Sequence, residues 1–136
     1  MYYDLFNGDA DGICALLQLR LAEPRDATLV TGVKRDINLM ARIHPETGDE
    51  VTVLDVSMDK NRAALEAALD SGAKVFYVDH HFPGDIPDHP GLTALVNEAP
   101  DVCTAALING HLQGRYVEWA VTGAFGDNLA ETAGRL

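Results

Sequence analysis

Cysteine is scarce in this sequence, which has only Cys14 and Cys103. Both sit among apolar neighbours, a pattern that predicts buried free thiols and gives no support to a disulfide framework or a redox pair. Residues 1–4 lack the basic start and the apolar stretch of a secretory signal peptide. These two absences together predict a cytoplasmic location.

Long apolar runs and cationic side chains are also in short supply. No apolar run approaches the roughly 18 residues that a membrane-spanning helix needs, so we expect no such helix. Only 10 basic residues stand against 21 acidic ones, a formal net charge of −11. This balance predicts weak binding of long nucleic acids by this chain alone. The surplus of acid serves either solubility or a cage of carboxylates around metal ions.

What the sequence does contain is an alternation of short apolar runs with helical patterns, without internal repeats. Near-continuous apolar strands that alternate with helices predict a parallel sheet covered on both faces. The expected fold class is α/β, a doubly wound three-layer domain with about five parallel strands, helices on both faces and a helical C-terminal tail. The predicted strands are 2–7, 28–33, 51–54, 75–78 and 92–96, and the predicted helices are 11–21, 35–43, 60–69, 104–112, 117–125 and 129–133.

Two of these helices carry further expectations. Apolar residues recur at helical spacing along 11–21, which predicts that Ile13, Leu16, Leu17 and Leu21 lie on one face of this helix. The segment 35–43 reads as a helix that ends before Pro45.

Three of the predicted strands end in residues of the same chemical kind. The first runs into Asn7-Gly8-Asp9-Ala10-Asp11-Gly12, the third ends on Asp55, and the fourth ends on Asp79-His80-His81. The carboxyl ends of parallel strands lie on one edge of the sheet, where ligands bind in a crevice. We therefore expect these carboxylates and imidazoles, far apart in sequence, to meet in one crevice.

Such a group of side chains indicates a metal site. Several carboxylates at close quarters cannot all be ionised near neutral pH without a countercharge. Carboxylates with imidazole and no thiolate favour Mn²⁺, with Mg²⁺ or Co²⁺ as alternatives. Two such ions about 3.5–4 Å apart can clamp a phosphoryl group and activate water, which makes hydrolysis of a phosphoester or phosphoanhydride the expected chemistry. Two plainer readings stay open: Asp9 and Asp11 as helix caps, and a solvated histidine pair.

The same residues resemble the motifs of the DHH phosphoesterases, a family named for its Asp-His-His sequence. The segment 7–12 is similar to the first motif, Asp55 to the isolated aspartate of the second, Asp79-His80-His81 to the third, and Gly126-Asp127-Asn128 to the fourth. These motifs span residues 7–128 in the family's order. The family includes RecJ-like exonucleases, phosphodiesterases of short oligonucleotides and of cyclic dinucleotides, exopolyphosphatases and manganese pyrophosphatases.

The resemblance implies two metal ions and assigns their ligands. Asp9 would bind the first ion and Asp55 would bridge both. The second ion would be bound by Asp11, His80 and Asp127. Without the resemblance, Asp127 reads as an ordinary N-cap of the last helix.

The resemblance also implies roles for the other two residues of the third motif. His81 would lie nearer the substrate phosphate, as a hydrogen-bond donor or acid. Asp79 would orient the site from outside the metal ligands, as carboxylates commonly do for metal-bound histidine. Thr104 would either lie near the substrate, as the family implies, or cap its helix. The implied substrates are a small phosphorylated compound, a short oligonucleotide or polyphosphate.

Two departures from the family bear on activity. Asn7 stands where the family usually has a histidine ligand, so it is at most a weak, neutral ligand. The sequence stops at Leu136, whereas the family continues into a second, substrate-binding domain, so we expect 1–136 to be the N-terminal DHH domain of a longer protein. Two functions follow: a metal-dependent phosphohydrolase, or a non-catalytic module that binds metal or phosphate. A phospho-acceptor receiver domain is disfavoured, because that kind of domain normally needs a lysine after a late strand. Lys74 instead precedes its strand and so lies at the wrong edge of the sheet.

Overall fold

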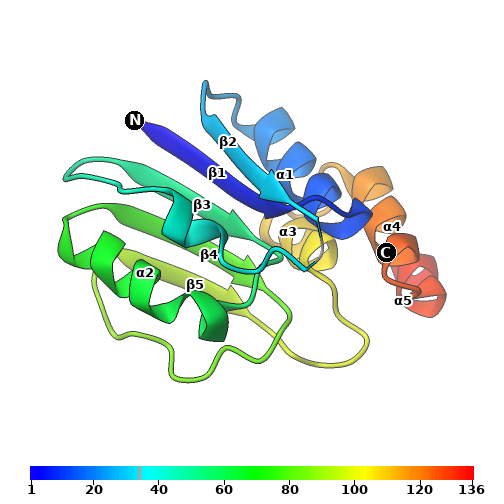
Figure 1. Ribbon diagram of the computed structural model, residues 1–136. Coiled ribbons are helices and arrows are strands. Elements are labelled where there is room, and N and C mark those ends of the chain that lie inside the picture. The colour runs from blue at the N-terminus through cyan, green and yellow to red at the C-terminus, as the bar shows by residue number, and fades with distance from the viewer. Residues whose placement is uncertain (34) are drawn as a thin grey trace.

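Five parallel strands form the centre of the molecule. The computed structural model describes residues 1–33 and 35–136. The strands are β1 (Tyr2–Asn7), β2 (Thr28–Gly32), β3 (Glu50–Leu54), β4 (Lys74–Asp79) and β5 (Leu92–Val96). Their order across the sheet is β2-β1-β3-β4-β5, and every neighbouring pair is parallel. Figure 1 shows the strands running in one direction.

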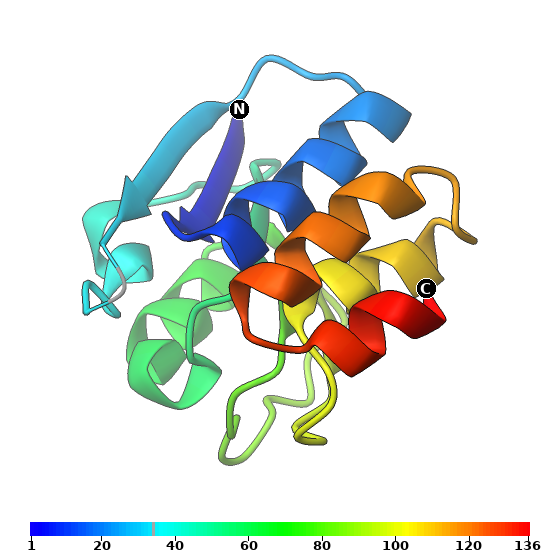
Figure 2. The same ribbon diagram turned by 90° about the vertical axis from the view of Figure 1, so that its right-hand side faces the viewer.

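Helices cover both faces of this sheet, so the doubly wound α/β fold predicted from the sequence is confirmed. One face carries α1 (Ala10–Ala22), α3 (Thr104–His111), α4 (Val117–Gly126) and α5 (Ala130–Arg135), which lie side by side in Figure 2. The other carries α2 (Met58–Asp70) and the short 3-10 helix η1 (Leu39–Arg42). Among the described residues, no helix is long and apolar enough to cross a membrane.

The three central strands, β1, β3 and β4, form because their apolar residues fill two cores at once. Side chains alternate across a strand, so Leu5, Val53 and Tyr77 pack under α2 and η1. Their neighbours in sequence belong to the other core, under α1, α3 and α4; they include Phe6, Leu54 and Val78. Burial on both faces explains the near-continuous apolar runs.

The apolar face predicted for α1 is only partly buried, with Leu16 in the core. Ile13 and Leu21 are 46% and 43% exposed, whereas Cys14, Ala15 and Gln18 are buried. This helix packs against the sheet and also against α3 and α4. Its buried stripe therefore contains small and polar residues, and the side-chain nitrogen of Gln18 donates to the backbone oxygen of Ala105 at 3.0 Å.

The predicted helix over 35–43 is wrong in extent, since the described part of this segment holds only the four-residue η1. Side-chain hydrogen bonds replace the helical ladder here. Asn61 on α2 accepts from the backbone N–H of Met40 at 3.2 Å and donates to the backbone oxygen of Ile37 at 2.6 Å. The connection from β2 to β3 is thus held by α2, and its described residues form no α-helix.

The sheet order sets where a ligand is expected. The chain leaves β1 for β2 on one side and returns to β3 on the other side of β1. In sheets of this kind, the crevice outside the carboxyl ends of the strands on either side of such a reversal binds ligands. Here those strands are β1 and β3.

Candidate metal centre

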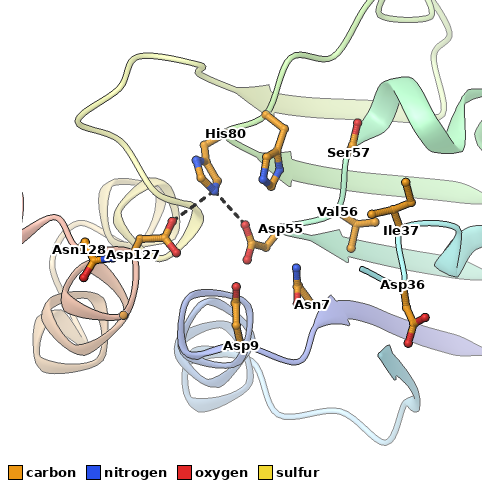
Figure 3. Close-up of a pocket in the computed structure, with 12 residues that line it drawn as sticks. Asn7, Asp9, Asp36, Ile37, Asp55, Val56, Ser57, His80, Asp127 and Asn128 are labelled. Atoms are coloured by element: carbon orange, nitrogen blue, oxygen red, sulfur yellow. Dashed lines mark ion pairs between the residues drawn. The ribbon is translucent and has the colours of Figure 1, made fainter. Parts of the chain in front are cut away.

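A cavity of about 300 Å³ opens at this carboxyl edge. Residues from the ends of β1, β3 and β4 and from the end of α4 line it, as Figure 3 shows. The lining includes Asn7, Asp9, Asp36, Ile37, Asp55, Val56, Ser57, His80, His81, Gly126, Asp127 and Asn128. The structure therefore brings residues of all four motifs to one cavity.

The turn after β1 places Asp9 at the N-terminus of α1. The Asp9 side chain accepts a hydrogen bond from the backbone N–H of Gly12 at 3.0 Å, so it caps this helix. Gly12 is required at its position because a Cβ atom there would collide with the backbone oxygen of Asn7. Capping occupies one carboxylate oxygen of Asp9, and the side chain still lines the cavity.

Asp11 is fully buried and caps a different helix, α3. Its Oδ2 accepts the backbone N–H of Thr104 at 3.0 Å, and its Oδ1 accepts that of Ala105 at 2.7 Å. Negative charge at a helix N-terminus is stabilised by the unpaired N–H groups there. Asp11 thus joins α1 to α3 while its Oδ2 stays 3.5 Å from Nε2 of His80.

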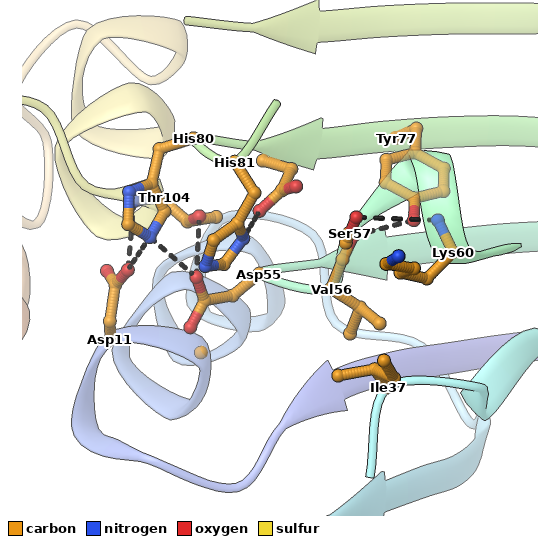
Figure 4. Close-up of polar contacts among 12 residues, drawn as sticks. Asp11, Ile37, Asp55, Val56, Ser57, Lys60, Tyr77, His80, His81 and Thr104 are labelled. Atoms are coloured by element: carbon orange, nitrogen blue, oxygen red, sulfur yellow. Dashed lines mark hydrogen bonds and ion pairs between the residues drawn. The ribbon is translucent and has the colours of Figure 1, made fainter. Parts of the chain in front are cut away.

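Asp55 occupies the centre of the site. It is only 2% exposed and has a left-handed backbone (φ +64°) directly after β3. Thr104 donates its hydroxyl to Oδ1 of Asp55 at 3.2 Å, as Figure 4 shows. Burial, followed by the nearby charges of Asp11 and Asp9, raises the pKa of Asp55 to about 10. Without a cation, this shift favours the protonated form of the Asp55 side chain.

One nitrogen of His80 faces three carboxylates. Its Nε2 lies 3.1 Å from Oδ1 of Asp55, 3.4 Å from Oδ2 of Asp127 and 3.5 Å from Oδ2 of Asp11. Asp11, His80 and Asp127 each present a ligand atom within 4.8 Å of the others. These are the three residues that the resemblance to the DHH family assigns to the second metal ion.

The other histidine is anchored at its opposite nitrogen. Nδ1 of His81 lies 2.7 Å from Oδ1 of the fully buried Asp79. This hydrogen bond is the main cause that raises the pKa of His81. Asp79 was expected to orient the site from outside the metal ligands, and it contacts the ring of His81. It also belongs to a second group of possible ligands, with Asp55, His80 and His81.

Asp127 reaches the site through close helix packing. A Cβ atom on Gly126 would lie 2.6 Å from Cβ of Ala10, and one on Gly123 would lie 2.5 Å from Cβ of Ala105. These glycines let α4 approach α1 and α3 closely, which brings Asp127 to His80. The plain reading of Asp127 as the N-cap of the last helix is wrong, since it ends α4 and Leu129 precedes α5.

The sequence left part of the site unassigned. Asp36, Ile37, Val56, Ser57 and Asn128 also line the cavity. Ile37 and Val56 form an apolar wall opposite the carboxylates in Figure 3. Their positions just after strands β2 and β3 are the signal that points to them.

Two buried oxygens are suited to a cation. Oδ1 of Asn7 and Oδ2 of Asp79 have no hydrogen-bond partner among the described residues, and Asn7 is only 9% exposed. Buried polar atoms in proteins are rarely left unsatisfied. With Asp9, Asp11, Asp55, His80 and Asp127 nearby, the donor set is oxygen with imidazole, which suits hard or borderline divalent ions.

Comparison with known proteins gives matches at the level of structure. No family model matches the sequence, and a search of curated proteins finds no relative. One similar solved structure is exonuclease RecJ bound to manganese, with 23% identity and a TM-score of 0.57 over 97% of this chain and 42% of that one. Another is an exopolyphosphatase-related protein from Bacteroides fragilis, with 16% identity and a TM-score of 0.50 over 98% of this chain and 46% of that one. This chain spans less than half the length of either protein, and it shares the fold of that part.

Proposed function

We propose that this chain is the catalytic domain of a divalent-metal-dependent phosphohydrolase of the DHH type. It cleaves a phosphodiester or phosphoanhydride bond with water, using two Mn²⁺ ions, or Mg²⁺ or Co²⁺ in their place. The observation that carries the proposal is the buried Asp55 among three further carboxylates and His80.

Charge explains why this arrangement calls for cations. Burying a carboxylate beside others raises its free energy unless a positive charge neutralises it. The fold places Asp9, Asp11, Asp55 and Asp127 close together, and any two of these carboxylates repel each other when both are ionised. Two divalent ions would neutralise the four negative charges, which explains how all four carboxylates can share one site.

The ligands divide between two ions in the proposed arrangement. Asp11, His80 and Asp127 would hold one ion, and Asp9 with the weak ligand Asn7 would hold the other. Asp55 would serve both from the centre of the site. When bound, such ions polarise a phosphoryl oxygen and lower the pKa of water.

His81 is proposed to contact the substrate phosphate. The Asp79 contact fixes its Nδ1, so Nε2 is the nitrogen left to face a ligand in the cavity. The raised pKa favours the protonated ring, which donates a hydrogen bond to a phosphate oxygen or a proton to the leaving group. Asp79 acts by holding this ring.

The proposed substrates are a small phosphorylated compound, a short oligonucleotide or polyphosphate, hydrolysed in the cytoplasm. The net charge of −11 disfavours long polynucleotides for this domain alone. Each of the two similar protein chains is more than twice as long as this chain. Recognition of the substrate beyond its phosphate is therefore proposed to need a further domain.

A second candidate function is a module that binds metal or phosphate without turnover. Asn7 favours this second function, because a neutral amide oxygen is a weaker metal ligand than the histidine usual at this position. Among the described residues, its Oδ1 has no hydrogen-bond partner. Asn7→His separates the two functions. If weak binding of the first ion prevents turnover, this substitution tightens Mn²⁺ binding and increases hydrolysis; if the wild-type site already holds two ions, neither changes appreciably.

Metal stoichiometry and hydrolysis measured together test the proposal. Mn²⁺ is titrated into the chain by calorimetry, and hydrolysis of an aryl phosphodiester is followed with Asp55→Ala as the control. Two bound ions with hydrolysis that Asp55→Ala abolishes support the phosphohydrolase. One ion or none, without turnover, supports the non-catalytic module.

A further inference from the structure

Arg62 lies on α2 outside the cavity lining, yet it grips the loop that follows His81. Its Nη2 donates to the backbone oxygen of Pro83 at 2.7 Å, and its Nε donates to that of Asp85 at 3.1 Å. Its Nη1 donates to Oδ1 of Asp59, one turn earlier on α2, at 3.2 Å. Each nitrogen of the guanidinium therefore has its own acceptor.

The loop is shaped around this guanidinium. Gly84, between the two gripped carbonyl groups, has a left-handed backbone (φ +67°). A Cβ atom at Gly84 would collide with Nη2 of Arg62 and lie 2.7 Å from Oδ1 of Asp59. Glycine is thus required both by its backbone angle and by the space that Arg62 fills. Pro83 is itself buried, which fixes the start of the loop.

Through this contact, Arg62 connects two segments that carry site residues. Helix α2 begins at Met58, three positions after Asp55, and the gripped loop begins two positions after His81. A second bond, from the hydroxyl of Tyr77 to the backbone oxygen of Val56 at 2.6 Å, joins strand β4 itself to the segment after β3 inside the core. The segment after β3 and the loop after β4 are therefore held at a fixed separation.

We propose that Arg62 is a positioning residue for His81. This inference rests on the proposed function, in which His81 contacts the substrate phosphate. The Asp79 contact orients the ring of His81, and the Arg62 clamp fixes the backbone that follows it. Lysine cannot replace this clamp, because it offers no planar set of donors to three separate acceptors. A displacement of about 1 Å in such a group lowers rates by roughly 100-fold.

Kinetics with saturating Mn²⁺ on an aryl phosphodiester test the role of Arg62 in turnover. For Arg62→Ala and Arg62→Lys we expect kcat to fall by roughly tenfold or more, with little change in KM. Arg135→Ala is the matched control, since Arg135 is exposed and, among the described residues, its side chain hydrogen-bonds to Asp101 and Thr132 alone. In a His81→Gln background, Arg62→Ala is expected to lower kcat by less than about twofold, because positioning His81 no longer matters.

A spectroscopic measurement tests the same inference without turnover. In the metal-free full chain, the Nδ1 proton of His81 is expected as a low-field NMR signal that His81→Gln removes. Arg62→Ala should broaden or shift this signal, and Arg135→Ala should not. An unchanged signal in Arg62→Ala, or a kcat loss that adds fully to that of His81→Gln, would overturn the inference. If the wild type does not hydrolyse the ester, the proposed function fails and the NMR signal alone judges Arg62.

Discussion

Asp11 and Thr104 are 93 positions apart in the sequence, yet the backbone N–H of Thr104 donates to Oδ2 of Asp11 at 3.0 Å. Thr104 in turn donates its hydroxyl to Asp55 at 3.2 Å. The N-terminus of α3 is therefore bonded to two carboxylates of the candidate metal centre. Asp11 has a structural role in addition to any role as a ligand.

This double role predicts that Asp11→Ala destabilises the metal-free protein. The substitution leaves the buried N–H groups of Thr104 and Ala105 without acceptors, at a cost of about 1–3 kcal/mol for each such group. Because two such groups lose their acceptor, we expect a net loss of at least about 2 kcal/mol. Urea unfolding in the presence of a chelator measures it. Wild-type stability in Asp11→Ala would show that α3 does not depend on this cap.

For Asp55 we expect the opposite response, in which substitution stabilises the metal-free protein. We also expect the free energy of unfolding of the wild type to depend on pH. The pKa of Asp55 is about 10 in the folded chain, because of burial and then the neighbouring carboxylates, against about 3.9 when unfolded. Between these values the folded state binds one more proton than the unfolded state. The free energy of unfolding of the metal-free protein therefore falls as pH rises, by up to about 1.4 kcal/mol per pH unit from this group.

Asp55→Asn removes that titration. We expect the variant to be more stable than the wild type in chelator at pH 8, with a flatter dependence between pH 5 and pH 8. Added Mn²⁺ should stabilise the wild type and have little effect on Asp55→Asn. Thermal unfolding across this range gives all three results. A wild type that gains stability as pH rises from 5 to 8 would contradict the assignment of a buried, protonated Asp55.

The contact with Asp79 controls the pKa of His81. The hydrogen bond from Asp79 raises the pKa of this histidine, so Asp79→Asn is expected to lower it. In NMR titrations of the metal-free chain, the His81 resonance of Asp79→Asn should titrate at lower pH than that of the wild type. The alkaline limb of the pH–rate profile should move in the same direction if His81 acts as a proton donor. A His81 pKa that Asp79→Asn leaves unchanged would show that the contact is not formed in solution.

The close packing of Gly126 against α1 is expected to control the affinity of the site for Mn²⁺. In Gly126→Ala the new methyl group would meet Cβ of Ala10, at 2.6 Å in the present geometry, and push α4 away from α1. Asp127 moves with α4, so Mn²⁺ affinity is expected to fall by about 10- to 100-fold, as for other residues that support metal ligands.

The compensating change is Ala10→Gly, which removes the atom that the new methyl group meets. We expect the double variant Ala10→Gly/Gly126→Ala to recover most of the Mn²⁺ affinity in calorimetry, and Ala10→Gly alone to bind as the wild type does. Equal affinity in Gly126→Ala and the wild type would remove the glycine contact from the account.

The sheet and the residues at its carboxyl edge follow from sequence because both depend on strand polarity. Apolar runs identify β1, β3 and β4, and parallel strands carry Asp9, Asp55 and His80 to the same edge. Asp127 lies at the end of a helix and is found only through the resemblance to a known family. The approach of Asp127 depends on the glycines of α4 meeting alanines of α1 and α3, a tertiary contact that has no local pattern.

The departures from the predicted structure also have physical causes. Ile13 and Leu21 are apolar and correctly spaced for a helix face, but α1 packs against helices as well as the sheet, so its buried stripe includes Asp11 and Gln18. Helical propensity over 35–43 yields to the side-chain hydrogen bonds of Asn61. In both cases, a polar side chain forms hydrogen bonds with a backbone group distant in sequence, and the observed structure therefore differs from the one that the apolar spacing predicts.

A crystal of the full chain grown with Mn²⁺, with anomalous diffraction collected at the manganese edge, tests the central claim most directly. The account predicts two manganese peaks in the cavity at the carboxyl edge of the sheet. One should contact Asp11, His80 and Asp127, the other Asp9, and Asp55 should contact both. A cavity without manganese, or manganese bound away from these side chains, would contradict it.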